Sequence, residues 1–324
     1  MNFWFGKKVL VTGGAGLIGS HVVEELVKKG SIVTVADNLK RGNVKNLRQV
    51  INDIEFSKVD LTDKNACNKV CDKKDVVFHL ASDAYGLSYS YTHHSEILTH
   101  NILLNTNILN ACHIKEVKRV LAVSSSCVYS DDANIPTKES EGFNGEPEKA
   151  NIGYGWSKRI LEIQANRLHL DYGMEIAIVR PANVYGPRDP ITGEGTHVIP
   201  SMIHKVLCGK GPITVWGSGN QSRNFIYVKD MAAAMVLVTE KYPISKAVNV
   251  GSTKATSMKE LIQLITQITE TKREIVFDTT KPEGAKHKSV DISLLKEVVG
   301  FKLKTALEEG LFETIKFYKD ELCL

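Results

Sequence analysis

Short apolar runs, rich in β-branched residues, alternate with longer amphipathic stretches through the first 180 residues. An apolar run of roughly 4–8 residues between polar or glycine positions is typical of a buried strand. The pattern predicts six strands: Val9–Thr12, Ile32–Ala36, Ile54–Lys58, Val76–Leu80, Arg119–Ser124 and Glu175–Arg180. Strands that alternate with helical stretches indicate a parallel sheet covered by helices on both faces.

The helical stretches show their own spacing. Residues 16–29 carry Ile18, Val22 and Leu26 on one face and end at Gly30, which suits a helix C-terminus. Two longer helices are predicted at Ser95–His113 and Tyr154–Tyr172.

The sequence pattern changes after Arg180, where glycine and proline become frequent between Gly186 and Gly219. We therefore expect an α/β protein with a Rossmann-type, doubly wound parallel sheet in residues 1–180 and a smaller α+β substrate lobe, mainly in residues 181–324. A return strand and helix are expected at about 225–253, with Ala247–Val250 as the last strand of the sheet. The amphipathic helix Ser257–Thr269 follows.

Composition narrows the functional classes. The net charge of +4 comes from scattered lysines, so it does not favour a nucleic-acid partner. No apolar run approaches the roughly 20 residues of a membrane span, and the lead Met1–Gly6 is too short for a signal peptide. The six cysteines form neither a C-x-x-C pair nor a disulfide pattern, so we expect a cytoplasmic protein without a metal site.

A glycine-rich motif follows the first strand. Gly13, Gly16 and Gly19 are spaced G-x-x-G-x-x-G as a helix begins, which lets backbone N–H groups approach a pyrophosphate at the helix N-terminus. Asp37 ends the second strand, where a carboxylate accepts hydrogen bonds from ribose hydroxyls and repels a 2′-phosphate. Lys40 and Arg41 soften that repulsion. The motif therefore predicts NAD as cofactor in preference to NADP.

A tyrosine and a lysine lie four residues apart at the start of a predicted helix. Tyr154 and Lys158 share one helix face, where a cation is expected to lower the pKa of the phenol and fit it for acid–base catalysis. An ordinary amphipathic helix start is the plain alternative to this interpretation.

Together with the glycine motif and the Tyr154/Lys158 pair, the stretches Ser124-Ser125-Ser126-Cys127-Val128-Tyr129 and Arg180-Pro181-Ala182-Asn183-Val184-Tyr185-Gly186-Pro187 resemble the extended short-chain dehydrogenases/reductases, which include sugar epimerases and dehydratases. The resemblance implies that Tyr154 is the acid/base, that Lys158 also binds the nicotinamide ribose, and that Ser125 hydrogen-bonds the reacting oxygen. It also implies a set of cofactor contacts: Gly13, Gly16, Leu17, Ile18, Gly19, Asp37, Asn38, Asp60, Leu61, Leu80, Ala81, Ser82, Ser124, Tyr154, Lys158 and Pro181.

The residues after Ser125 bear on the reaction. Dehydratases of this superfamily typically have an acidic pair there, whereas this chain has Ser126 and Cys127, as in GDP-L-fucose synthase and GDP-mannose 3,5-epimerase. A keto group at C4 acidifies the neighbouring C–H bonds, so Cys127 and a second group are expected to invert C3 or C5. His197 matches the histidine of the fucose-synthase pattern. Structural roles remain open for both, a small buried side chain for Cys127 and a packing residue for His197.

The second half is also similar to the fucose-synthase pattern, in Val215-Trp216-Gly217-Ser218-Gly219, Arg223-Asn224-Phe225 and Lys281-Pro282-Glu283-Gly284. That similarity implies a nucleotide-sugar substrate, with GDP-hexose favoured and UDP or dTDP as alternatives. The implied substrate contacts are Asn183, Lys205, Trp216, Arg223 and Lys288, and exposed, solvated cations are the plain alternative for the lysines.

Four functions remain open. Asp37 departs from the fucose synthases and resembles UDP-galactose 4-epimerases that retain NAD, which favours an epimerase working through a transient 4-keto sugar. Inversion at C4, as in 4-epimerases, and inversion at C3 or C5 through Cys127 and His197 both stay open. The alternatives are a fucose-synthase-like 3,5-epimerase/4-reductase that uses NAD(P)H, a nucleotide-sugar 4-dehydrogenase and a non-catalytic dinucleotide sensor. A homodimer through the two long helices is expected from the resemblance.

Overall fold

The computed structural model describes residues 2–193, 195–281 and 284–323, so Pro282 and Glu283 of the motif above lie outside the described residues. Its main sheet has seven parallel strands in the spatial order β3-β2-β1-β4-β5-β6-β10. The strands are β1 (Lys8–Thr12), β2 (Ile32–Asp37), β3 (Ile54–Lys58), β4 (Val76–His79), β5 (Arg119–Val123), β6 (Glu175–Pro181) and β10 (Ile244–Val250). This order confirms the predicted doubly wound α/β fold.

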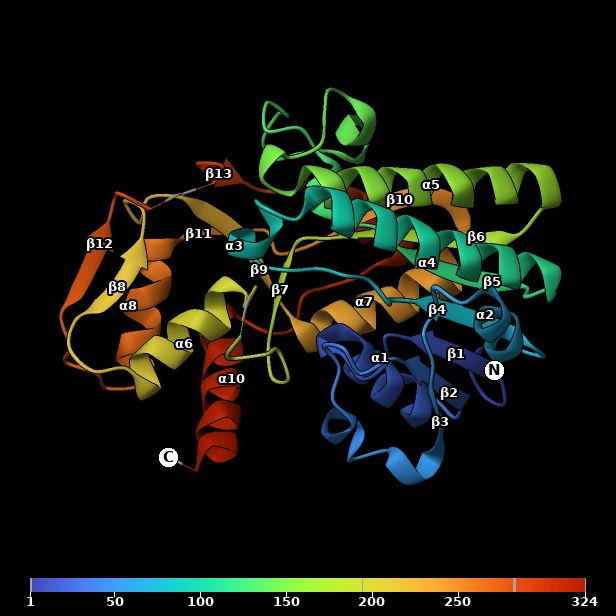
Figure 1. Ribbon diagram of the computed structural model, residues 1–324, viewed down its shortest axis with the longest axis horizontal. Coiled ribbons are helices and arrows are strands. Elements are labelled where there is room, and N and C mark those ends of the chain that lie inside the picture. The colour runs from blue at the N-terminus through green and yellow to red at the C-terminus, as the bar shows by residue number, and fades with distance from the viewer. Residues whose placement is uncertain (1, 194, 282–283, 324) are drawn as a thin grey trace.

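Helices cover both faces of this sheet (Figure 1). One face carries α2 (Lys64–Cys71), α4 (His94–Ile114) and α5 (Ile152–Tyr172), and the other carries α1 (Leu17–Lys28), α7 (Val228–Lys241) and α9 (Ser293–Val299). The strands between them are buried on both faces, as a parallel sheet requires: Val9, Val11 and Phe78 are fully buried on one face, and Leu10 and Val77 on the other.

The remaining elements gather mainly at the other end of the molecule in Figure 1. A second sheet centres on β9 (Ser222–Tyr227), which pairs with β7 (Asn183–Tyr185), β11 (Ala255–Ser257) and β13 (His287–Lys288), while β8 (Ile213–Trp216) pairs with β12 (Ile275–Asp278). Helices α6 (Val198–Cys208), α8 (Met258–Ile268) and α10 (Leu307–Leu322) pack here around a separate apolar core. The short helix α3 (Leu87–Ser90) follows β4.

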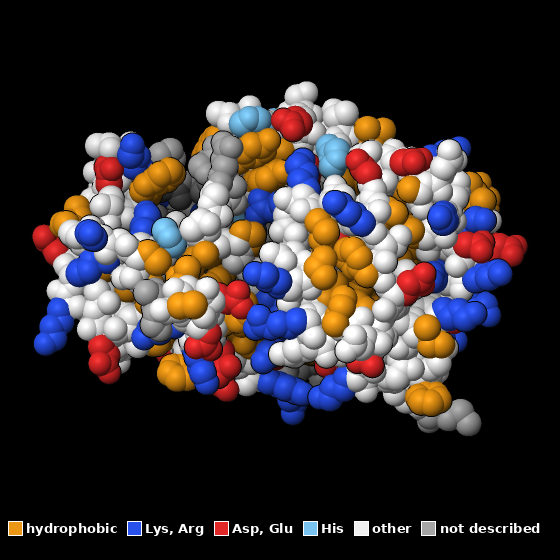
Figure 2. All heavy atoms as spheres, turned by 60° about the horizontal axis from the view of Figure 1, so that its bottom comes forward, with side chains coloured by type: hydrophobic (Ala, Val, Ile, Leu, Met, Phe, Trp, Pro, Cys, Tyr) orange, Lys and Arg blue, Asp and Glu red, His pale blue; other side chains and the backbone are white. Residues whose placement is uncertain are grey.

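The surface agrees with the scattered charge of the sequence. On the face shown in Figure 2, Lys and Arg side chains are spread across the width of the molecule and are interleaved with acidic and apolar ones. Within the described ranges, each helix is too short or too polar to cross a membrane.

Candidate active site

A cavity of about 800 Å³ opens at the carboxyl ends of the main strands and extends to the second sheet. In an open parallel sheet, ligands bind at this edge, where the strand order reverses. Here the reversal is at β1, which lies between β2 and β4. Every residue that the sequence assigned to the cofactor, to catalysis or to the substrate lines this one cavity.

The glycine loop fits a dinucleotide pyrophosphate. Gly13 has a positive φ of 66°, and a Cβ there would lie 2.8 Å from the backbone of Ala81. A Cβ on Gly19 would lie 2.1 Å from the carbonyl oxygen of Gly13. Gly16 precedes α1 without a side-chain cap, so the first N–H groups of the helix remain available to an anion.

The end of β2 supplies the acid expected at the adenosine ribose. Asp37 is buried and accepts hydrogen bonds from the backbone N–H groups of Ala15, at 3.0 Å, and Leu39, at 2.8 Å. These bonds fix the carboxylate beside the glycine loop. Lys40 donates to Asp83 at 3.0 Å, and Arg41 stacks on Tyr85 with 4.6 Å from its guanidinium to the ring centroid. The two cations are thus engaged by residues after β4.

The catalytic residues expected from the resemblance converge at the end of β5. Tyr154 lines the cavity together with Ser125 and Ser82, and the Lys158 ammonium lies 5.4 Å from the Tyr154 ring centroid. Lys158 also donates to the carbonyl oxygen of Val123 at 2.8 Å. A sugar hydroxyl in this part of the cavity can hydrogen-bond to both Ser125 and Tyr154.

The sequence predicted a lowered pKa for Tyr154, and this prediction is wrong for this structure. Burial raises the pKa of Tyr154, and the neighbouring hydroxyls of Ser82 and Ser125 oppose that shift only in part. Burial also lowers the pKa of Lys158 to about 7, because its charge is removed from water. The spacing along the helix correctly put Tyr154 and Lys158 on one face. It could not show how far the surrounding elements bury that face from solvent.

Behind the site, a buried ion pair joins β6 to α5. Arg180 donates two hydrogen bonds to Glu162, at 2.7 and 2.8 Å, and one to the hydroxyl of Tyr129 at 2.9 Å. Ser124, assigned above to the cofactor, gives its hydroxyl to Glu162. This network fixes the backbone that presents Ser125 and Cys127.

Cys127 lies in the short turn Ser126–Val128, which follows Ser125. Its backbone N–H donates to the hydroxyl of Ser125 at 3.1 Å. Burial raises the pKa of the thiol to about 11; Lys288 opposes the shift and the carboxylate of Glu148 adds to it. The thiol is therefore protonated at neutral pH and is a proton donor in this state.

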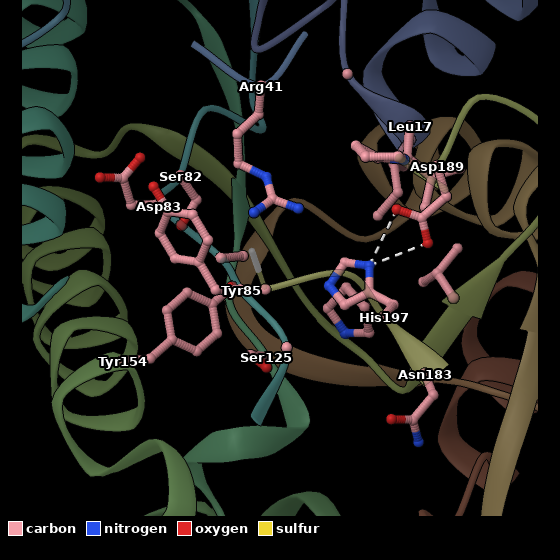
Figure 3. A pocket seen from close by; sticks show the side chains of 18 of the residues that line it. Leu17, Arg41, Ser82, Asp83, Tyr85, Ser125, Tyr154, Asn183, Asp189 and His197 are labelled. Carbon is pink, nitrogen blue, oxygen red and sulfur yellow. Dashed lines mark hydrogen bonds and ion pairs between the residues drawn. The ribbon is translucent and has the colours of Figure 1, made fainter. Parts of the chain in front are cut away.

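His197 faces the same cavity from the residue before α6. Figure 3 shows Tyr154 and Ser125 on one side of the view and His197, bonded to Asp189, on the other. Both carboxylate oxygens of Asp189 lie 3.0 Å from His197 Nδ1. The negative charge of Asp189 raises the pKa of His197 against the effect of burial. Asp189 thereby favours a proton on Nδ1 and leaves Nε2 for exchange with a ligand.

Sequence reasoning missed Asp189 and Glu148. Asp189 is buried, and its backbone carbonyl accepts a hydrogen bond from Tyr318 of α10 at 2.6 Å. Glu148 is buried beside Cys127 and pairs with Lys288 at 2.7 Å. Neither carboxylate stands at a helical or strand spacing from its partner, so periodicity held no signal for either.

The expected substrate contacts line the same cavity, on the side of the second sheet. Arg223 is largely buried, with Nη1 donating to the carbonyl oxygens of Ser222 and Ala285. The Lys205 ammonium donates to the carbonyl oxygen of Thr214 at 2.9 Å, and Asn183 donates to the backbone of Asn224. The Trp216 side chain is 44% exposed, which leaves it available to a planar ligand group.

These features define a dinucleotide-dependent enzyme of the short-chain dehydrogenase type. A family model described as the NAD dependent epimerase/dehydratase family matches residues 9–251, and the chain belongs to this family. NAD is therefore its cofactor, as the sequence predicted.

Similar proteins share the substrate class but not one reaction. The chain is 33% identical to a UDP-N-acetyl-alpha-D-glucosaminuronate decarboxylase of Bacillus cytotoxicus, over 97% of this chain and 98% of the relative. It is 29% identical to GDP-mannose 3,5-epimerase 1 of Oryza sativa subsp. indica, over 99% of this chain and 84% of the relative. The solved UDP-N-acetylglucosamine 4-epimerase of Methanobrevibacter ruminantium is 34% identical, with a TM-score of 0.88 and coverage of 98% and 99%.

Proposed function

We propose that this enzyme epimerises a nucleotide-linked hexose at C3 or C5 through a transient 4-keto sugar, with no net oxidation. One observation carries the proposal: a protonated thiol, Cys127, and a carboxylate-backed imidazole, His197, line the same cavity as Tyr154, Lys158 and Ser125. Inversion of a carbon next to a carbonyl needs one group to remove a proton and another to return one. A reaction confined to C4 gives no role to this pair.

The residues divide the reaction between them. Tyr154 exchanges the proton of the C4 oxygen, while Ser125 hydrogen-bonds that oxygen and Lys158 lies beside the phenol. Bound NAD⁺ would accept the hydride from C4 and return it at the end. While C4 is a ketone, His197 Nε2 removes the proton from C3 or C5, and the Cys127 thiol delivers one to the opposite face of that carbon. Exchange of both groups with solvent resets them.

Arg223 and Lys205 are proposed to hold the substrate pyrophosphate, with Trp216 and Asn183 alongside. GDP-hexose is the favoured substrate, because the second lobe resembles that of GDP-L-fucose synthase and Cys127 is shared with that enzyme and with GDP-mannose 3,5-epimerase. The decarboxylase and 4-epimerase relatives make UDP-sugars the next class to assay.

Solvent deuterium is expected to enter the product at C3 or C5 when GDP-, UDP- and dTDP-hexoses are incubated with the enzyme in D₂O without added reductant. Cys127→Ser and His197→Asn should each slow this incorporation by about 10²-fold or more, because each removes one partner in proton transfer. NMR of the products measures the position and rate of exchange.

The chain offers matched controls in Cys208→Ser and His204→Asn, at residues that are absent from the cavity lining. Both should exchange deuterium at the wild-type rate. An isomerised sugar without deuterium would replace the proposal with C4 inversion by hydride return. Turnover only with added NAD(P)H and a 4-keto sugar would replace it with the reductase.

An apolar stripe on α5 supports the expected homodimer. Trp156, Ile163 and Leu170 recur every seven residues and are 38%, 51% and 61% exposed, and Leu103 of the neighbouring α4 is 48% exposed. Exposed apolar side chains on two neighbouring helices fit the same side chains of a second copy around a two-fold axis.

Ile163→Glu is expected to convert the dimer to a monomer, because it buries a carboxylate in the apolar contact. Sedimentation equilibrium measures the mass. Phe312→Glu, at a 55% exposed site on α10, is the control and should leave the dimer intact. A wild-type protein that sediments as a monomer at micromolar concentration contradicts this assembly.

A further inference from the structure

Three charged side chains surround the Cys127 thiol at the sugar end of the cavity. Glu148 comes from the loop before α5, and Lys288 and Arg223 come from the neighbouring strands β13 and β9, where they are register partners. Glu148 is 5% exposed, and its backbone N–H donates to the carbonyl oxygen of Cys127. Its carboxylate lies close enough to the Cys127 thiol to raise the pKa of that thiol, and both side chains line the cavity.

Glu148 is ionised in this environment. Its Oε2 accepts hydrogen bonds from Lys288 at 2.7 Å and from Asn151 at 3.0 Å. Burial alone would raise the pKa of Glu148, but the charge of Lys288 and these hydrogen bonds outweigh it and lower the pKa to about 2. The cation of Lys288 is thus compensated inside the protein, and the wall next to Cys127 presents a carboxylate.

The position of the Glu148 carboxylate limits which group the sugar can carry at C6. The following step rests on the proposed function, in which Cys127 delivers a proton to the reacting carbon. At C5 that carbon also carries C6, so the group on C6 lies within reach of the side chains that touch Cys127. A C6 carboxylate would meet Glu148, since Lys288 is already paired with it and Arg223 is proposed to bind the pyrophosphate. A C6 hydroxyl can donate a hydrogen bond to Glu148 instead.

We propose that Glu148, paired with Lys288, is a specificity residue that admits nucleotide hexoses with an uncharged C6 and excludes nucleotide uronates. The site therefore differs in substrate class from one that accepts a sugar acid, although a relative of this chain acts on a glucosaminuronate. Like charges brought together in a binding site are strongly unfavourable, so the expected preference for the uncharged sugar is on the order of 100-fold in Kd.

Calorimetric titration of the NAD-loaded protein tests this with two pairs of ligands that differ only at C6: UDP-glucose with UDP-glucuronate, and GDP-mannose with GDP-mannuronate. The wild type should bind the hexose of a pair about 100-fold more tightly than its uronate. Glu148→Gln frees Lys288 to meet the uronate, so the ratio should fall to within a few-fold of one. Asp131→Asn, which removes a nearby carboxylate outside the cavity lining, should leave the ratio unchanged.

The double variant Glu148→Gln/Lys288→Gln guards against misfolding, because it leaves no unpaired charge in the wall. It too should lose the discrimination, with NAD retention as the check on folding. Equal binding of hexose and uronate by the wild type, or an unchanged ratio in both variants, overturns the proposal. Binding of neither ligand in either pair overturns it together with the proposed function.

The two proposals fail separately. The Kd ratio requires no turnover, whereas the deuterium experiment measures turnover alone. If the wild type prefers the hexose about 100-fold but incorporates no deuterium, Glu148 keeps its role as the specificity residue at C6. The proposal that Cys127 takes part in proton transfer is then rejected. Deuterium incorporation with equal hexose and uronate affinities keeps the proposed reaction and rejects the role of Glu148.

Discussion

Replacing Tyr154 by phenylalanine is expected to lower kcat by about 10²–10⁴-fold, the usual contribution of a general acid–base group. The change removes only the phenolic hydroxyl, which faces the cavity together with Ser125 and Ser82. The glycine loop and Asp37 remain, so bound NAD should stay at the wild-type level. Turnover is followed by NMR, and the cofactor is quantified after release from the purified protein.

Tyr172→Phe provides the matched control, because Tyr172 ends the same helix and is 62% exposed. It should turn over like the wild type. If Tyr154→Phe keeps wild-type activity, Tyr154 is not the acid–base group. If it keeps NAD and a biological role without turnover, the dinucleotide sensor becomes the better hypothesis.

Glu162→Ala is expected to reduce the free energy of unfolding by about 3–5 kcal/mol, because it leaves the guanidinium of Arg180 buried without its counter-ion. Arg180 and Glu162 are 3% and 4% exposed and share two hydrogen bonds. Ser124 would lose its acceptor as well. Urea unfolding monitored by circular dichroism gives the difference.

The same helix supplies the comparison. Arg167 and Asp171 form an ion pair one turn apart on the exposed side of α5. Asp171→Ala should cost about 0–1 kcal/mol, since solvent screens an exposed pair and rehydrates the freed charge. Similar losses in the two variants would show that Arg180 finds water or another partner once Glu162 is gone.

Local pattern was sufficient for the main sheet. The predicted strand Ile54–Lys58 has the observed bounds, and the other five strands of the first half differ from prediction by one residue at one end. The inner strands are buried on both faces and must be almost continuously apolar, whereas the edge strand β3 alternates apolar and polar residues, and both patterns can be read from the sequence. The glycine spacing likewise placed the turn between β1 and α1, because only glycine fits where Gly13 and Gly19 approach neighbouring backbone.

The residue types at the site were also readable, since Tyr154 and Lys158 lie one helical turn apart and Ser125 follows a strand. The pKa values of these residues could not be predicted from the sequence. The sequence predicted a lowered pKa for Tyr154, whereas burial raises it and makes Lys158 the group that titrates near neutrality. Desolvation depends on every element that packs over a group, and no local spacing encodes that sum.

The sequence by itself therefore determined the strands and the doubly wound class of the fold, the cofactor loop and the candidate residues of the site. Only the tertiary structure decided which charged side chains contact these residues. Asp189 meets His197 across a glycine-rich loop, and Glu148 meets Lys288 from 140 positions away in the chain. Such pairs form because separate elements converge at one end of the sheet, and the distances between them follow from packing rather than from periodicity.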